Sequence, residues 1–79
     1  MKAKIITDNN SLLLGFRLGG ITGELITDKD LLAETFLQVS KEKDLALIIF
    51  TKSSYDPIKE IVENFRQHHT TPLIVVLEF

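Results

Sequence analysis

Runs of apolar residues alternate with short polar stretches along this chain, and their spacing predicts its secondary structure. Residues 45–51 hold six consecutive apolar residues, with charged stretches on both sides. The run is too short for a membrane span, which needs roughly 20 residues, and it lacks the alternation of a strand with one wet face. Its β-branched and aromatic residues favour a strand over a turn of buried helix. We therefore expect a strand buried on both faces, at the centre of a parallel sheet.

Three further segments have the composition of strands. Residues 3–7 include Ile5, Ile6 and Thr7, which favour a strand, and residues 73–77 form a final apolar run. The segment 21–26 is weaker, because Gly23 and Glu24 disfavour a strand, and we expect it at an edge of the sheet.

A short helix is predicted over residues 12–18. It can begin near Ser11, because residues 8–10 are cap and turn formers, with Asp8 expected in that turn or cap. Gly19 and Gly20 then end it, as glycine does past a helix C-terminus. The helix is apolar nearly all the way round, with only Ser11 and Arg17 polar, so we expect it to need contacts on every side.

Two longer helices are expected farther along the chain. The second begins with Thr27 as its cap and runs to about Lys43, and the third opens over residues 53–57, where Pro57 is tolerated in a first turn. His68 and the residues after it end the third helix. Apolar residues recur at helical spacing in both: Leu32, Phe36 and Val39, then Ile58, Ile61, Val62 and Phe65.

The resulting order is βαβαβαβ, which predicts one α/β domain over residues 1–79 with a small four-stranded parallel sheet. Crossovers between parallel strands are right-handed in about 98% of cases. With strand order 2-1-3-4, the rule gives a three-layer, Rossmann-like or receiver-like arrangement. Helix one lies alone on one face, and helices two and three lie on the other. A fourth helix would complete the thinner layer, so we expect that the natural protein is longer or that a partner covers this face.

Composition narrows the functional classes. The 79 residues include no cysteine, which excludes a disulfide framework and a thiolate metal site. A formal net charge of −2 and a pI near 5.6 give no basic footprint for nucleic acid. The cationic start has too short an apolar stretch for a signal peptide. We therefore expect neither secretion nor direct insertion into a membrane.

The expected carboxyl ends of the strands carry few acids. Asp8 follows strand one, and Thr51 and Lys52 follow strand three, where a phospho-accepting receiver domain would need its acceptor aspartate. One carboxylate does not hold Mg²⁺, which binds through carboxylates together with waters and phosphate. A receiver-like or small-ligand-regulated signalling domain therefore remains only an alternative hypothesis.

Neither the glycines nor the histidines indicate a site. Gly15 and Gly19 lie inside and after a helix, whereas a phosphate loop lies between a strand and a helix start, so close packing and a helix stop explain them better. His68 and His69 are adjacent, and on a helix their side chains point about 100° apart. We predict no catalytic residue, no cofactor site and no metal site. Arg17 is a candidate anchor for a protein contact.

Three blocks of the chain resemble a known family. Residues 14–21, Leu-Gly-Phe-Arg-Leu-Gly-Gly-Ile, resemble the G-F-R-L-x-G motif that follows strand one in the F subunit of the V-type (archaeal/vacuolar-type) ATPase. Residues 47–51 resemble its third strand, which typically ends in Ile-Thr-Glu, and residues 71–76 its fourth. The spacing of the blocks agrees over nearly the whole chain. Lys52 departs from the family's glutamate, and the family continues past the position of Phe79 into a C-terminal helix, so a truncated or a naturally short chain is expected.

The resemblance implies a non-catalytic subunit of a rotary ATPase. In that family the F subunit lies on the central stalk, is bound mainly to the coiled-coil D subunit, and couples ATP turnover to rotation and to proton or sodium transport, while ATP binds on other subunits. It implies a cytoplasmic position, peripheral to the membrane. We expect the partner-binding residues to be Leu14, Phe16, Arg17 and Leu18 of this sequence. Because the helix-one face is under-covered, we also expect this chain to self-associate. A scaffold that merely shares the fold remains a further alternative.

Overall fold

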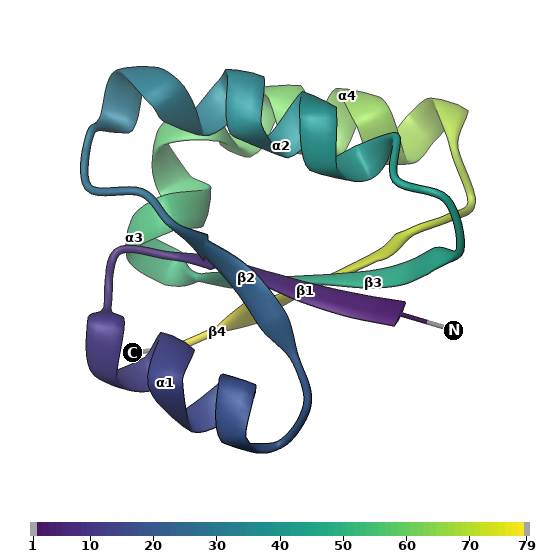
Figure 1. Ribbon diagram of the computed structural model, residues 1–79. Coiled ribbons are helices and arrows are strands. Elements are labelled where there is room, and N and C mark those ends of the chain that lie inside the picture. The colour runs from purple at the N-terminus through teal and green to yellow at the C-terminus, as the bar shows by residue number, and fades with distance from the viewer. Residues whose placement is uncertain (1, 79) are drawn as a thin grey trace.

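Strands and helices alternate along residues 2–78, which are the residues that the computed structural model describes (Figure 1). The predicted domain of residues 1–79 includes Met1 and Phe79, which lie outside the described residues. The elements are β1 (Lys2–Thr7), α1 (Asn10–Leu18), β2 (Thr22–Leu25), the 3₁₀ turn η1 (Lys29–Leu31), α2 (Leu32–Ser40), β3 (Leu45–Thr51), α3 (Lys52–Tyr55), the 3₁₀ turn η2 (Asp56–Ile58), α4 (Lys59–His68) and β4 (Leu73–Leu77).

The four strands form one parallel sheet in the order β2-β1-β3-β4. This confirms the predicted α/β fold and strand order, with the weak segment β2 at an edge. In β3, Ile48 and Phe50 face one helical layer while Ile49 faces the other, and all three are buried. The run of apolar residues is therefore an interior strand covered on both faces, as the lack of alternation predicted.

The larger core lies between the sheet and the layer formed by α2 and α4, which cover the same face (Figure 1). The fully buried ring of Phe36 lies at its centre, with ring centroids 5.8 Å from Phe50 and 5.2 Å from Phe65. Tilted and edge-to-face contacts of this kind add to the stabilisation from apolar burial. The predicted helical stripes supply this core: Leu32, Phe36, Val39, Ile58 and Val62.

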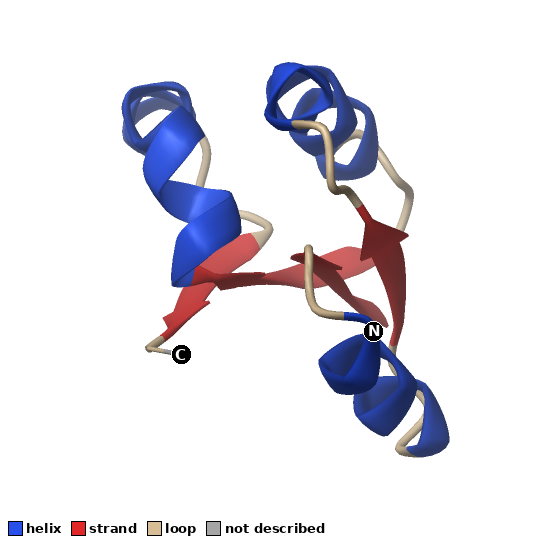
Figure 2. Cartoon of the chain, turned by 90° about the vertical axis from the view of Figure 1, so that its left-hand side faces the viewer, coloured by secondary structure: helices blue, strands red, loops and turns tan. Residues whose placement is uncertain are grey.

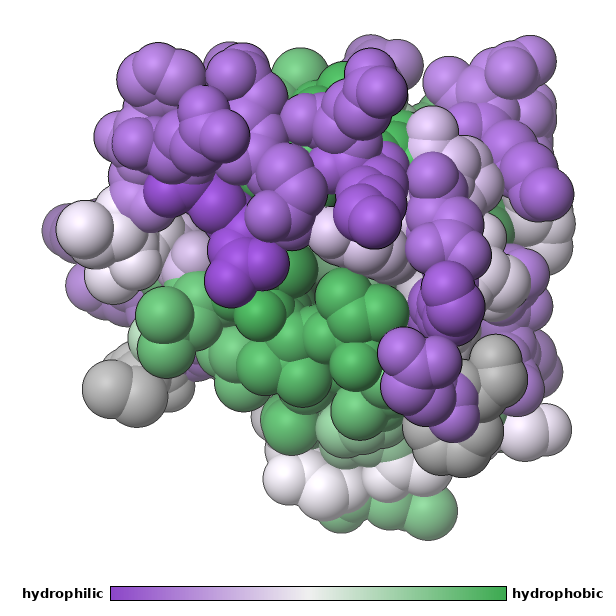
Figure 3. All heavy atoms as spheres, turned by 180° about the vertical axis from the view of Figure 1, so that it is seen from behind, coloured by the Kyte–Doolittle hydropathy of each residue, from purple (hydrophilic) through white to green (hydrophobic). Residues whose placement is uncertain are grey.

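The opposite face of the sheet has a smaller core, formed by the buried residues Ile5, Leu13 and Ile49. Figure 2 shows α1 beneath the β2–β1 side of the sheet, with no helix beneath β4 in the described part of the chain. Seen from behind, apolar atoms form a continuous patch on this side of the molecule (Figure 3). The thinner layer that the topology predicted is therefore present, and it covers only part of its face.

Two helix starts differ from the sequence-based expectations. The cap of α1 is Asn9, whose Oδ1 accepts a hydrogen bond from the N–H of Leu12 at 3.0 Å, so the helix begins before Ser11. Thr27 is not the second cap. Asp28 accepts from the N–H of Asp30 at 3.0 Å and opens η1. Both differences have the same cause. Several residues that can cap a helix are adjacent in the sequence, and the path of the backbone into the helix decides which of them becomes the cap.

Two helices also end or continue differently from the prediction. The expected helix to Lys43 ends at Ser40, and Asp44 then adopts φ 65° before β3. Aspartate tolerates this left-handed conformation better than most residues. The expected third helix starts at Lys52, directly after β3, and is divided into α3, η2 and α4. Pro57 lies in η2 and has no N–H for the helical ladder, which accounts for the interruption.

Gly23 allows β2 to approach β1 closely. It pairs with Ile5, and a Cβ added at Gly23 would overlap the main-chain oxygen of Ile5 and lie 2.5 Å from its Cγ2 atom. The glycine that disfavours a strand in isolation is therefore required by this one, since tertiary contact overrides local propensity.

Candidate interaction surface

Hydroxyl groups join the carboxyl ends of β1 and β3, where open parallel sheets usually bind ligands. The buried Thr7 Oγ1 lies 3.1 Å from the buried Thr51 Oγ1, and it accepts a hydrogen bond from the N–H of Asn9. Thr51 Oγ1 also donates to the buried Ser54 Oγ at 3.3 Å. These groups bind one another, so the network fastens β1, β3 and α3 together.

Two charged groups at the same edge, Asp8 and Lys52, are also engaged within the chain. Asp8 accepts a hydrogen bond of 2.8 Å from Ser53 Oγ. Lys52 forms an exposed ion pair of 3.0 Å with Asp56, and this hydrogen bond and charge raise the pKa of Lys52. No group of three or more metal-ligating side chains occurs among residues 2–78. Asp8 is not the helix cap, since Asn9 takes that role, and this edge does not assemble the acid cluster of a receiver.

A second polar contact joins α3 to α4. Tyr55 donates a hydrogen bond of 2.6 Å to Glu63 Oε2, which also accepts from Arg66 at 3.1 Å. Burial and the neighbouring Glu63 raise the pKa of Tyr55 to about 12. The hydrogen bond from Tyr55 lowers the pKa of Glu63. The contact spans the Pro57 turn and has a structural role, because it joins the two halves of the expected third helix.

The adjacent histidines lie at the end of α4 and each bonds to the helix itself. Nδ1 of His68 lies 2.9 Å from the carbonyl oxygen of Asn64, and Nδ1 of His69 lies 3.1 Å from that of Phe65. The ring of His69 also stacks on Phe65 with centroids 4.1 Å apart. The side chains therefore finish the helix and do not converge on a shared ligand.

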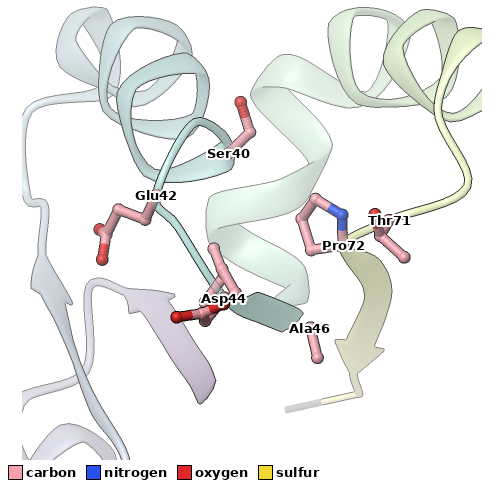
Figure 4. Close-up of a pocket in the computed structure, with 7 residues that line it drawn as sticks. Ser40, Glu42, Asp44, Ala46, Thr71 and Pro72 are labelled. Carbon is pink, nitrogen blue, oxygen red and sulfur yellow. The ribbon is translucent and has the colours of Figure 1, made fainter. Parts of the chain in front are cut away.

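A hollow of about 430 Å³ lies at the opposite, amino end of β3 and β4 (Figure 4). Glu42 and Asp44 line it, but their carboxylates point away from Thr71 and Pro72 across the hollow. Glu42 instead pairs with Lys4 at 2.9 Å. The polar groups do not converge on one point, so the hollow lacks the arrangement that fixes a small ligand.

The outer face of α1 exposes three of the four predicted partner-binding residues. Leu14 is 48% exposed, Leu18 is 92% exposed, and Arg17 is exposed between them. Residues separated by three or four positions share a helix face, so these side chains form one surface. Phe16 does not join them. It is half-buried and packs against the smaller core, because it lies on the side of the helix that faces the sheet.

Gly15 lies open on the same helix. It lines a shallow hollow of about 240 Å³ together with Ser11, Leu12 and Phe16. A Cβ added at Gly15 would meet no atom within 4 Å, so the expectation of close packing there is wrong. The helix stop is confirmed, since Gly19 is the C-cap and Gly20 has φ 90°.

Strand β4 adds apolar surface that the sequence-based reasoning did not identify. Leu73 is 64% exposed and Val75 is 41% exposed on the α1 side, where Leu77 packs partly against the smaller core. Ile74 and Val76 face the larger core. The place of β4 in the sheet explains this exposure. A short helix does not extend as far as this edge strand, so alternate residues of the strand stay uncovered even though the whole strand is apolar.

A family described as "ATP synthase (F/14-kDa) subunit" has a sequence profile that matches residues 4–78 of this chain. The chain belongs to this family. The match spans α1, the sheet and the helical layer, and it confirms the resemblance first seen in residues 14–21. This F-subunit chain is thus a component of a V-type ATPase, and membership implies that it associates with other subunits of that complex. A search of curated proteins found no match to the chain.

Within residues 2–78 of this F-subunit chain, no helix is both long enough and apolar enough to cross a membrane.

Proposed function

We propose that this chain is a central-stalk, rotor subunit of the V-type ATPase. It couples ATP turnover to rotation and to proton or sodium transport through protein–protein contacts alone, and it takes no part in the chemistry. The observation that carries the proposal is the family match over residues 4–78. In this role the chain lies on the cytoplasmic side, peripheral to the membrane, and its main partner is the D subunit of the stalk.

The outer face of α1 supports a role in protein contact. Leu18 is almost fully exposed, which leaves about 2 kcal/mol of apolar transfer free energy unrealised in the isolated chain. Leu14 adds to this surface, and Arg17 lies between the two leucines with no resolved ion pair among the described residues. An arginine beside apolar residues is typical of the centre of a protein interface. We therefore assign binding of the D subunit to Leu14, Arg17 and Leu18, with Phe16 supporting α1 from beneath.

The hydrogen bonds and the ion pair at the carboxyl ends of the strands also support a subunit that acts only through protein contacts. The side chains that would do chemistry in a receiver-like domain are used to hold the fold, with Asp8 bound by Ser53 and Lys52 by Asp56. Force transmitted through a stalk requires a rigid body, and the buried Thr7–Thr51 bond ties the two interior strands at their ends. These contacts favour the stalk role over a ligand-switched signalling role.

Co-purification with the D subunit tests the proposal. A tagged D subunit, co-expressed with this chain, should retain the wild-type chain and lose most of a Phe16→Ala/Arg17→Ala variant. Because Phe16 also packs on the smaller core, Arg17→Ala alone separates binding from folding, since its side chain is exposed. The control is Leu37→Ala/Ile61→Ala on the helical layer. Retention of the double variant at the wild-type level would contradict the assigned surface, and loss of the wild-type chain from the tagged partner would contradict the proposed role.

A further inference from the structure

The outer edge of β4 is open and unprotected. In the described part of the chain, β4 pairs only with β3, and its other side faces away from the sheet. Its five residues, Leu-Ile-Val-Val-Leu, carry no charge and strongly favour a strand. The other edge, β2, is shorter and contains Gly23 and Glu24. Natural sheets protect their edges with short strands and charges, so β2 is guarded and β4 is not.

The apolar face of β4 lies next to this open edge. Leu73 and Val75 are exposed on the α1 side of the sheet. Helix α1 does not cover them, because it lies under β1 and β2 (Figure 2). An occupant of the edge would therefore gain main-chain hydrogen bonds and cover these side chains at once. Strand addition combines the same two sources of affinity in peptide recognition.

We propose that β4 pairs antiparallel with β4 of a second copy, about a two-fold axis at Val75. In this register Leu73 lies opposite Leu77 of the second copy, Ile74 lies opposite Val76, and Val75 lies opposite itself. Directly opposite residues of antiparallel strands share a face, so residues on the α1 side meet one another, the exposed Leu73 facing the half-buried Leu77, and residues that face the larger core meet one another. The two four-stranded sheets become one sheet of eight strands, with the two uncovered apolar faces on the same side.

Charge placement agrees with this occupant. The residue after β4 is Glu78 and the residue before it is Pro72. The two-fold register sets each Glu78 opposite Pro72 of the other copy, so the two carboxylates stand at opposite ends of the paired strands. The two-fold pairing therefore sets apolar residues against apolar residues and brings no like charges together, as a symmetric interface requires.

The area available makes this a weak dimer. Pairing five residues and their exposed side chains buries several hundred Å² in total, below the roughly 1,200 Å² at which stable interfaces begin. The dimer should therefore form and dissociate readily, with a population that depends on concentration. It uses the edge of the sheet, whereas the surface proposed to bind the D subunit is the outer face of α1, so either inference can fail without the other.

Sedimentation of the 79-residue chain over a range from about 10 µM to 1 mM, which brackets weak affinities, tests the proposal. The average mass of the wild type should rise toward that of a dimer. Val75→Lys and Val75→Glu should each weaken association at least tenfold, because like charges face each other at the axis. An equimolar mixture of these two variants should dimerise again, because the charges are then opposite.

Three controls make the result decisive. Ile61→Lys places the same charge on α4 at an equal 41% exposure and should dimerise like the wild type. Val75→Thr keeps a strand-favouring residue of similar size, so it should stay folded and still associate more weakly. Leu18→Lys, on α1, should leave dimerisation unchanged. A wild type that stays monomeric, a mixture that stays monomeric, or a loss of association in Leu18→Lys instead of the Val75 variants would overturn the β4 pairing.

Discussion

Gly15→Ala and Gly23→Ala are the same chemical change with opposite expected effects. Gly15 lies in the interior of α1 with a helical backbone, and an added Cβ meets no atom within 4 Å. Alanine in place of glycine in a helix interior is worth about 1 kcal/mol. For a domain of this size that corresponds to a rise in Tm of about 4–8 °C. We expect Gly15→Ala to stabilise the fold by that amount.

Gly23→Ala should destabilise the chain. The new Cβ would overlap the main-chain oxygen of Ile5, which belongs to an interior strand and has no free space to move into. Forcing extra atoms into a packed site typically costs about 1–3 kcal/mol, and we expect a loss of that size here. Thermal and urea unfolding followed by circular dichroism measure both variants. A lower Tm for Gly15→Ala, or an unchanged Tm for Gly23→Ala, would refute the packing described for these two positions.

The Gly15→Ala variant also allows an effect on stability to be distinguished from an effect on binding to the D subunit. If a side chain of the D subunit enters the hollow beside Gly15, alanine partly fills that space. We then expect Gly15→Ala to weaken binding to the D subunit while it raises Tm, which no purely structural effect would produce. Equal or tighter binding by Gly15→Ala would show that the partner does not use this hollow.

Three further predictions concern the interior. The single tyrosine, Tyr55, should titrate near pH 12 when followed by ultraviolet absorbance. Because its folded pKa lies above the unfolded value of about 10, its contribution to stability is full below pH 10 and is lost as pH rises from 10 toward 12. Titration near pH 10 would contradict its hydrogen bond to Glu63. Thr51→Val should cost about 1–2 kcal/mol in urea unfolding and show coupling to Thr7→Val in a double-mutant cycle, whereas additive effects would argue against the buried bond. Phe36→Ala should cost about 3–5 kcal/mol, enough to unfold much of a domain this small, and a folded variant with unchanged urea midpoint would contradict its central place in the core.

Local pattern predicted most of the fold because the main elements bury different faces. An uninterrupted apolar run at 45–51 indicates an interior strand, and the spacing of Leu32, Phe36 and Val39 indicates a helix with one buried side. The handedness of crossovers then placed the helices on their faces. What local pattern could not decide was the choice among neighbouring cap residues, such as Asn9 and Ser11, since each can serve and long-range geometry selects one.

The candidate surface was only partly predictable for the same reason. The motif lies in α1, but it could not show that Phe16 turns toward the sheet while Leu14 and Leu18 turn outward. The exposure of Leu73 and Val75 depends on how far a short helix reaches across the sheet. The Thr7–Thr51 bond joins residues 44 positions apart. Such features depend on the assembled fold, and no local sequence pattern encodes them.

The most direct test of the stalk assignment is a calorimetric titration of the purified D subunit with this chain. The wild type should bind saturably and with equimolar stoichiometry, and Leu14→Ala/Leu18→Ala should bind at least tenfold more weakly, since truncating exposed apolar anchors removes contacts at an interface centre. The control Leu37→Ala/Ile61→Ala, on the opposite helical layer and of similar exposure to Leu14, should bind like the wild type. Equal affinities for all three proteins, or no heat of binding for the wild type, would contradict the account.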